Sequence, residues 1–268
     1  MKQKEIYQSW LKAVKTHDFE ETERLYAEIL REFPDLSGVH YPMGVWYKEK
    51  NLNQKAYDAL IRALKTDPDI MADTYYYLGN VLRNMGDYKE AVFYYTKSLE
   101  KDPEFFEAQY NLGKVYSMMG ENNRALEEYK KALKLNKQDL DTYVNIGVEF
   151  SNLGLHQEAL EMYQLALAID PHSSLVYSNI GVEYALLGQY EQAINYHKNA
   201  IKLNSFYGDA WYNLGCSYAL NNNQVDAIKA LEKAFKIDKE NIFYAKNDPE
   251  LESIRSTPEF KKLIELSL

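Results

Sequence analysis

The chain has 268 residues, a net charge of −9 at pH 7, a single cysteine and 24 tyrosines. The negative charge argues against nucleic-acid binding by phosphate neutralisation, and one cysteine excludes an intrachain disulfide framework and fits a reducing compartment. The first ten residues lack the apolar core of a secretory signal, and no run approaches the roughly 18 apolar residues of a membrane span, so we expect a cytoplasmic protein.

The sequence repeats itself with a period of 34 residues. Two sets of small residues carry this period: Gly79, Gly113, Gly147, Gly181 and Gly215, and Ala91, Ala125, Ala159, Ala193 and Ala227. Around them, apolar residues recur at steps of three and four, which is typical of helices with one buried face. Each unit is therefore predicted to form two helices that cross where small residues let their backbones approach. We number each unit so that its glycine is position 8.

Seven units are predicted, at 3–36, 37–71, 72–105, 106–139, 140–173, 174–207 and 208–241. The first has Trp10 at the glycine position and Thr22 at the alanine position, and this bulk should open the helix crossing. Terminal repeats have one face in water and are often atypical, so we interpret unit one as an N-terminal cap. Unit two carries Pro42 inside its expected first helix, which should start late or bend, and Pro68 after its second helix.

Unit three shows how a regular unit begins and ends its helices. Gly86 follows the first helix and can adopt the left-handed conformation that terminates it. Asp102 and Pro103 end the second helix, because proline cannot continue a helix and restricts the residue before it.

After unit seven, the segment 242–268 loses the period. Asp248-Pro249 and Thr257-Pro258 each resemble an N-cap residue followed by proline at the first helical position. Two short helices should follow, and their apolar residues could cover the last exposed helical face: Leu251, Ile254, Phe260, Leu263 and Ile264. We interpret the segment as a C-terminal cap, with a docking element as the alternative.

The pattern resembles the tetratricopeptide repeat (TPR) family, whose signature is W-x2-L-G-x2-Y, then A-x3-F, then P at period 34. Unit seven carries this signature at Trp211, Leu214, Gly215, Tyr218 and Ala227, and unit five carries it at Tyr143, Ile146, Gly147, Phe150, Ala159, Tyr163 and Pro171. The resemblance covers nearly the whole chain. It implies an all-α fold, an α-solenoid that forms a right-handed superhelix of about seven units (1–241) closed by the capping segment. Each first helix would then line a concave groove with positions 2, 5, 6, 9, 12 and 13.

Position 6 is asparagine in four consecutive units: Asn111, Asn145, Asn179 and Asn213. A carboxamide offers both a donor and an acceptor, so a ladder of them could hold the main chain of an extended peptide. Similar asparagine ladders bind peptide main chain in glycosyltransferase members of the family. The alternative is that these asparagines make only local polar contacts.

Two further groove positions carry repeated residue types. Position 2 is acidic at Asp73, Glu107, Asp141 and Asp209, which would favour a basic or amphipathic partner. The helix dipole alone favours acids in a first turn, so this pattern also has a purely structural explanation. Position 5 offers Tyr76, Tyr110 and Tyr212 as aromatic anchors.

Positions 9, 12 and 13 turn from polar to apolar along the chain. They are Asn80, Arg83 and Asn84 in unit three, Val182, Ala185 and Leu186 in unit six, and Cys216, Ala219 and Leu220 in unit seven. The apolar end is a candidate partner site, or else the chain's own last helix covers it.

The sequence gives little support for chaperone-tail binding, metal binding or catalysis. Asn80 and Asn111 match the asparagines of family members that grip chaperone C-termini, but Tyr76, Asp141 and Asn145 stand where those members need cations. The five histidines are scattered without metal-ligand spacing, and His197 should serve packing. No phosphate loop or nucleophile elbow occurs, so we predict neither catalysis nor a cofactor or metal.

We therefore expect a non-catalytic scaffold that binds a peptide or helical segment of a partner protein in its groove. Two alternatives stay open. The chain could be the recognition or regulatory subunit of a larger enzyme or secretion assembly, or an assembly protein that pairs with itself as a homo-oligomer.

Overall fold

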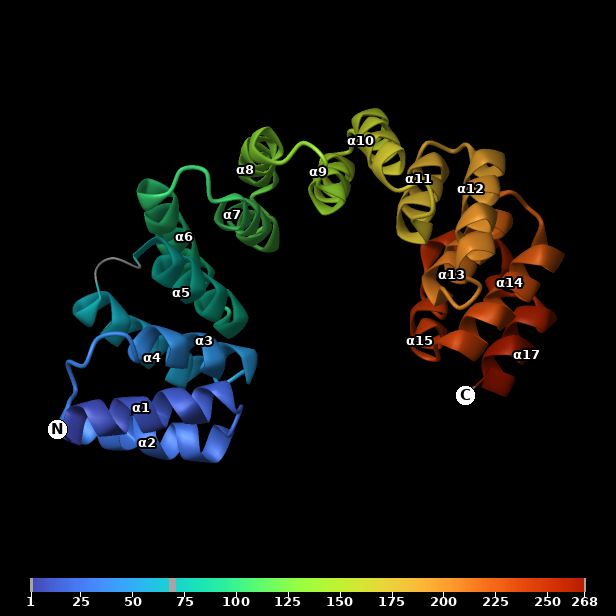
Figure 1. Ribbon diagram of the computed structural model, residues 1–268. Coiled ribbons are helices and arrows are strands. Elements are labelled where there is room, and N and C mark those ends of the chain that lie inside the picture. The colour runs from blue at the N-terminus through green and yellow to red at the C-terminus, as the bar shows by residue number, and fades with distance from the viewer. Residues whose placement is uncertain (1, 68–70, 268) are drawn as a thin grey trace. The chain divides into compact units, whose positions relative to one another are not determined.

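The computed structural model describes residues 2–67 and 71–267, and it is helical throughout this part (Figure 1). Pro68, expected to follow the second helix of unit two, lies outside the described residues. The chain divides into two compact halves, 1–136 and 137–268, each described by itself. Among the described residues, no helix has both the length and the apolar character needed to cross a lipid bilayer.

The N-terminal half consists of four helix pairs. They are α1 (Lys2–Lys15) with α2 (Phe19–Glu32), α3 (His40–Glu49) with α4 (Asn53–Thr66), α5 (Met71–Met85) with α6 (Tyr88–Lys101), and α7 (Phe106–Met118) with α8 (Asn122–Leu135). Helix α3 is short and begins at position 4 of its unit, because Pro42 can be accommodated only in the first turn. The late start predicted for this helix is confirmed.

The C-terminal half contains three helix pairs and a closing segment. The pairs are α9 (Leu140–Asn152) with α10 (His156–Ile169), α11 (Ser174–Leu186) with α12 (Tyr190–Leu203), and α13 (Gly208–Leu220) with α14 (Gln224–Ile237). The closing segment contains α15 (Glu240–Ala245), the 3-10 turn η2 (Pro249–Leu251), α16 (Glu252–Arg255) and α17 (Pro258–Ser267). The side chains of Asp248 and Thr257 accept hydrogen bonds from Glu250 N and Phe260 N, so both predicted N-caps are confirmed.

Units two to seven are each held together by a side chain of the second helix that lies against the position-8 glycine. A Cβ added at Gly147 would lie 2.4 Å from the ring of Tyr163, and one added at Gly79 would lie 2.7 Å from the ring of Tyr95. The five alanines that recur with the 34-residue period, from Ala91 to Ala227, are fully buried. The spacing predicts this burial, because the two helices of a unit cross closely at these alanines. In unit one the crossing is filled by Trp10, which is 1% exposed.

The turn between the two helices keeps one backbone conformation in all seven units. Position 15 has a positive φ at Gly86, Gly120, Gly154 and Gly188, with values between 73° and 85°. The same position is His17, Asn51 and Asn222 in the other units, with φ of 55°, 58° and 58°. Glycine adopts this region without steric cost, and asparagine tolerates it better than most residues do. The turn geometry is therefore kept even where the glycine is lost.

Candidate functional site

The asparagine at position 6 of unit four is already engaged inside the N-terminal half. Asn111 is 9% exposed, its Oδ1 accepts from Arg83 Nη1 at 3.0 Å, and its Nδ2 donates to Asn80 Oδ1 at 3.1 Å. Asn80 Oδ1 also accepts from the hydroxyl of Tyr95 at 2.8 Å. These side chains form one buried polar network across α5, α6 and α7. Asn111 therefore has a structural role that the repeat pattern did not predict.

The asparagines of the C-terminal half differ from Asn111 in their surroundings. Asn145 on α9, Asn179 on α11 and Asn213 on α13 are half-buried, so each carboxamide is partly accessible to solvent. Within residues 137–267, the side chains of Asn179 and Asn213 make no hydrogen bond to the protein. Their carboxamides can therefore accept and donate to an external main chain.

The four acidic residues at position 2 are all exposed. Asp73, Glu107, Asp141 and Asp209 lie in the first turns of α5, α7, α9 and α13. Each is at the positive end of its helix dipole, where a carboxylate stabilises the helix by about 0.3–1 kcal/mol. Their exposure also leaves them accessible to a basic partner.

The tyrosines at position 5 pack within aromatic clusters. The ring of Tyr76 lies 4.8 Å from Phe105 and 5.2 Å from Tyr77, measured between ring centroids. Tyr110 stacks on Phe106 with centroids 6.1 Å apart. Both tyrosines are half-buried, so these rings support the helices while part of each stays accessible.

The closing segment covers the groove positions of unit seven. The hydroxyl of Tyr212 donates to Asp248 Oδ2 at 2.5 Å, and the thiol of Cys216 lies 3.8 Å from the same oxygen. Ser253 Oγ donates to the carbonyl of Ala219 at 3.0 Å. Cys216 is 2% exposed. The chain therefore covers the apolar end at unit seven, with η2 and α16 rather than with its last helix, which packs on α14. In unit six, Leu186 stays 51% exposed.

The same contacts bring three potential metal ligands together. Ligand atoms of Cys216, Asp248 and Glu250 lie within 4.8 Å of one another. Burial and the nearby carboxylates raise the pKa of the Cys216 thiol well above its usual range, and burial raises the pKa of Glu250. Asp248 already accepts hydrogen bonds from the Tyr212 hydroxyl and from Glu250 N, so its carboxylate is used inside the protein. We assign the cluster a structural role. No spacing rule could have found it, because it joins a repeat to a segment without repeats.

Family profiles described as tetratricopeptide repeat match residues 72–105, 94–127, 140–173, 174–207 and 208–241, which together cover more than half of the chain. The chain belongs to the tetratricopeptide repeat family. TPR proteins mediate protein–protein interactions. Comparison with curated protein sequences found no match.

Solved TPR structures share this fold. The MamA protein is 26% identical, with a TM-score of 0.57 over 65% of this chain and 96% of that chain. YrrB, described as a TPR protein with an unusual peptide-binding site, is 24% identical, with a TM-score of 0.55 over 69% of this chain and 94% of that chain. The Cut9–Hcn1 hetero-tetramer of the APC/C is 21% identical, with a TM-score of 0.59 over 93% of this chain and 52% of that chain.

Two histidines take structural positions in these TPR units. His197 is fully buried against Gly181, as its replacement of the position-24 aromatic predicts. His156 Nδ1 lies 2.8 Å from the carboxylate of Glu183, which is 2% exposed. Glu183 and Glu149 are buried at position 10, where units three and four have valine. Those buried glutamates are a feature of the TPR core that we did not single out in the sequence.

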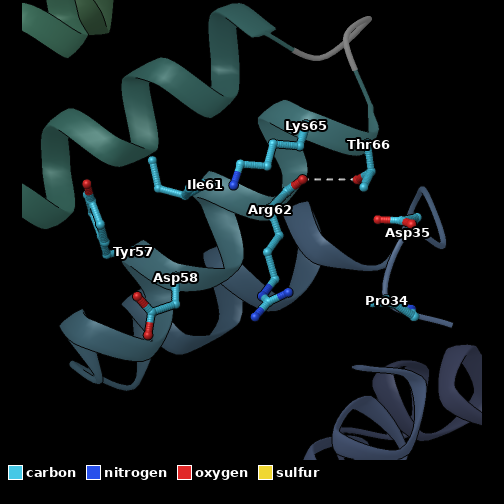
Figure 2. Close-up of a pocket in the computed structure, with 8 residues that line it drawn as sticks. All are labelled: Pro34, Asp35, Tyr57, Asp58, Ile61, Arg62, Lys65 and Thr66. Atoms are coloured by element: carbon cyan, nitrogen blue, oxygen red, sulfur yellow. Dashed lines mark hydrogen bonds between the residues drawn. The ribbon is translucent and has the colours of Figure 1, made fainter. Parts of the chain in front are cut away.

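A cavity of about 520 Å³ in the N-terminal half does not coincide with the predicted groove positions. Figure 2 shows its lining, with Tyr57, Asp58, Ile61 and Arg62 on α4 and Pro34 and Asp35 on the loop between α2 and α3. Helix α4 is a second helix of its TPR unit, whereas the expected groove is lined by first helices. Acidic and basic side chains are mixed here, and Thr66 Oγ1 donates to the carbonyl of Arg62 at 3.1 Å. Nothing in this lining selects one ligand charge.

Proposed function

We propose that this TPR protein is a non-catalytic scaffold that binds a segment of a partner protein along the groove positions of its first helices. In this proposal, Asn179 and Asn213 hold the main chain of the partner, and Asn145 extends the same row. Asp141 and Asp209 would favour basic side chains on that segment. The observation that carries the proposal is that two half-buried carboxamides at the same repeat position have no partner within residues 137–267.

Chemistry and family both support this function. A carboxamide pairs with a peptide unit through one donor and one acceptor, so it can hold a backbone without selecting its sequence. Apolar side chains stand beside Asn179 on α11, where Leu175 is 46% exposed and Leu186 is 51% exposed. These leucines lie four positions before and seven after the asparagine, on one helical face. They would contact apolar side chains of a bound segment.

Capture from native cell extract tests the proposal. Wild-type protein and the double variant Asn179→Ala, Asn213→Ala are used as bait, and bound proteins are quantified by mass spectrometry. A peptide from the strongest partner is then titrated calorimetrically. We expect the double variant to weaken binding at least about tenfold, since each lost carboxamide removes hydrogen bonds of about 0.5–1.5 kcal/mol.

A matched control separates the groove from general surface effects. Asn195 and Asn199 are exposed on α12, a second helix, and Asn195→Ala with Asn199→Ala removes the same chemistry there. This control should bind like wild type, and all variants should keep their helicity and melting temperature. If the groove variant and wild type bind the peptide with equal affinity, Asn179 and Asn213 do not contribute to partner binding.

Self-association is the second candidate function, and exposed aromatic side chains favour it. Phe206, Phe243 and Tyr244 are 81%, 73% and 61% exposed. Contiguous exposed apolar surface often marks an interaction site, and the rings of Phe243 and Tyr244 adjoin, with centroids 6.0 Å apart. Light scattering at two concentrations decides between the candidates, because a strict monomer at high concentration would exclude self-association.

A further inference from the structure

The segment 248–254, called the clasp below, lies on the positions of unit seven that we expect to face the groove. It contributes the contacts of Asp248 with Tyr212 and of Ser253 with Ala219. Its two aliphatic side chains, Leu251 and Ile254, are fully buried in the cluster that contains Cys216. The clasp therefore offers to α13 a carboxylate followed by two aliphatic side chains at three-residue steps.

The clasp is attached at both ends to helices that have contacts of their own with the last repeat. Helices α15 and α17 precede and follow it, and both pack on α14, the second helix of unit seven. The residues that flank the clasp, Asn247 and Ser256, are exposed. Because α15 and α17 make contacts of their own with α14, they can hold the cap of the array while the clasp lifts from α13.

The closed position of the clasp also brings acidic groups close together. It holds the carboxyls of Asp248 and Glu250 beside a buried thiol, and burial followed by the charge of Asp248 raises the pKa of Glu250. The regular structure within the clasp is limited to a 3-10 turn and a four-residue helix. Short elements with few regular backbone hydrogen bonds open at lower free energy than the long packed helices around them.

We propose that the clasp is an internal occupant of the groove of unit seven, and that a partner segment with the same order of groups displaces it. Such a segment carries a carboxylate that accepts from Tyr212, then aliphatic residues three and six positions later. This inference rests on the proposed function only in its second half, since occupancy by the clasp can be tested without any partner. Binding to repeats five to seven would then have to release the clasp first.

Thiol labelling measures the opening directly, because Cys216 is the only cysteine of the chain and lies under the clasp. Wild type, Leu251→Ala and Ser253→Ala are compared by reaction with a disulfide reagent under native conditions. Leu251→Ala leaves both carboxylates in place and removes a fully buried side chain, so labelling should accelerate by about 30-fold or more. Ser253→Ala removes one hydrogen bond and should accelerate labelling about fivefold. Circular dichroism verifies that each variant is folded.

Two comparisons complete the test. Leu78→Ala truncates an equally buried leucine on α5 in the other half and should label like wild type. A synthetic peptide with the sequence of residues 247–256 should protect Cys216 when added to the Leu251→Ala protein, and a scrambled peptide should not. The proposal is overturned if the clasp variants label no faster than Leu78→Ala, or if the peptide gives no protection. These readouts involve neither Asn179 nor Asn213, so they stand or fall separately from the proposed function.

Discussion

His197 packs against Gly181 in the place where a tyrosine ring packs against glycine in units three to five. A Cβ added at Gly181 would lie 2.5 Å from the imidazole Cε1. The ring is fully buried, and neither of its nitrogens has a hydrogen-bond partner in the described chain. Unit six thus carries two unsatisfied polar atoms at the centre of its helix crossing.

Replacing His197 by phenylalanine should stabilise the protein. Phenylalanine fills a similar space without buried polar atoms, and each unsatisfied buried group typically costs about 1–3 kcal/mol. We expect the free energy of unfolding to rise by about 1–3 kcal/mol, measured by urea titration of the helical signal. A loss of stability would mean that the crossing cannot accept the larger ring.

The same histidine should make stability depend on pH. Burial lowers the pKa of His197 from 6.5 to about 4, so the unfolded chain binds a proton in this range that the folded chain does not. Stability is therefore unaffected by His197 above pH 6.5 and falls as the pH drops from 6.5 towards 4, by up to about 3 kcal/mol. The measurement is the difference between wild type and His197→Phe at each pH, which cancels the contribution of the carboxylates. A difference that stays constant from pH 7 to pH 4 contradicts the assignment.

Two nearby glycines should respond differently to alanine. In Gly147→Ala the new methyl group overlaps the buried ring of Tyr163, which has no room to move, and overpacking of this kind costs about 1–3 kcal/mol. In Gly154→Ala nothing lies within 4 Å of the added Cβ, so only the positive φ of 74° costs free energy, about 1 kcal/mol. Urea unfolding of both variants checks the order, and equal losses would argue against the close crossing.

Removing an asparagine of the buried network should cost far more stability than removing an asparagine of the groove. Asn80→Ala leaves the Tyr95 hydroxyl and the amide of Asn111 without their shared acceptor, so we expect a loss of about 2–4 kcal/mol. Asn179→Ala removes a half-buried side chain that has no hydrogen-bond partner within residues 137–267, and should change stability by less than about 0.5 kcal/mol. Thermal unfolding followed by circular dichroism compares the two. A large loss in Asn179→Ala would give that residue a structural role.

The packing of the repeats could be predicted because each unit packs against units of similar sequence. Gly147 recurs every 34 residues from Gly79 to Gly215, and a large side chain stands at the position of Tyr163 each time, so the period indicates which side chains meet. The covering of Tyr212 by Asp248 could not be predicted in this way. It is a contact between a repeat and a unique segment, and depends on how the closing segment folds back over unit seven.

The hydrogen-bond network around Asn111 could not be predicted from the sequence either, for a different reason. Its position is shared with Asn179, but its partners Asn80 and Arg83 belong to unit three and have no counterparts at the same positions of unit five, which carries Val148 and Ser151. A repeated residue type therefore had different roles in different units. Whether a position-6 carboxamide forms hydrogen bonds within the protein depends on the side chains of the preceding unit.

The turn glycines have a consequence for engineering. A Cβ added at Gly154 or Gly188 would meet no atom within 4 Å, so a side chain at either position would point into open space. The entropy of closing a surface loop grows only slowly with its length, which means that an inserted peptide would leave the flanking helices paired. A candidate ligand grafted at Gly188 on a flexible linker would reach the adjacent first helices at millimolar effective concentration. Weak ligands could thus be screened as fusions, one sequence per clone.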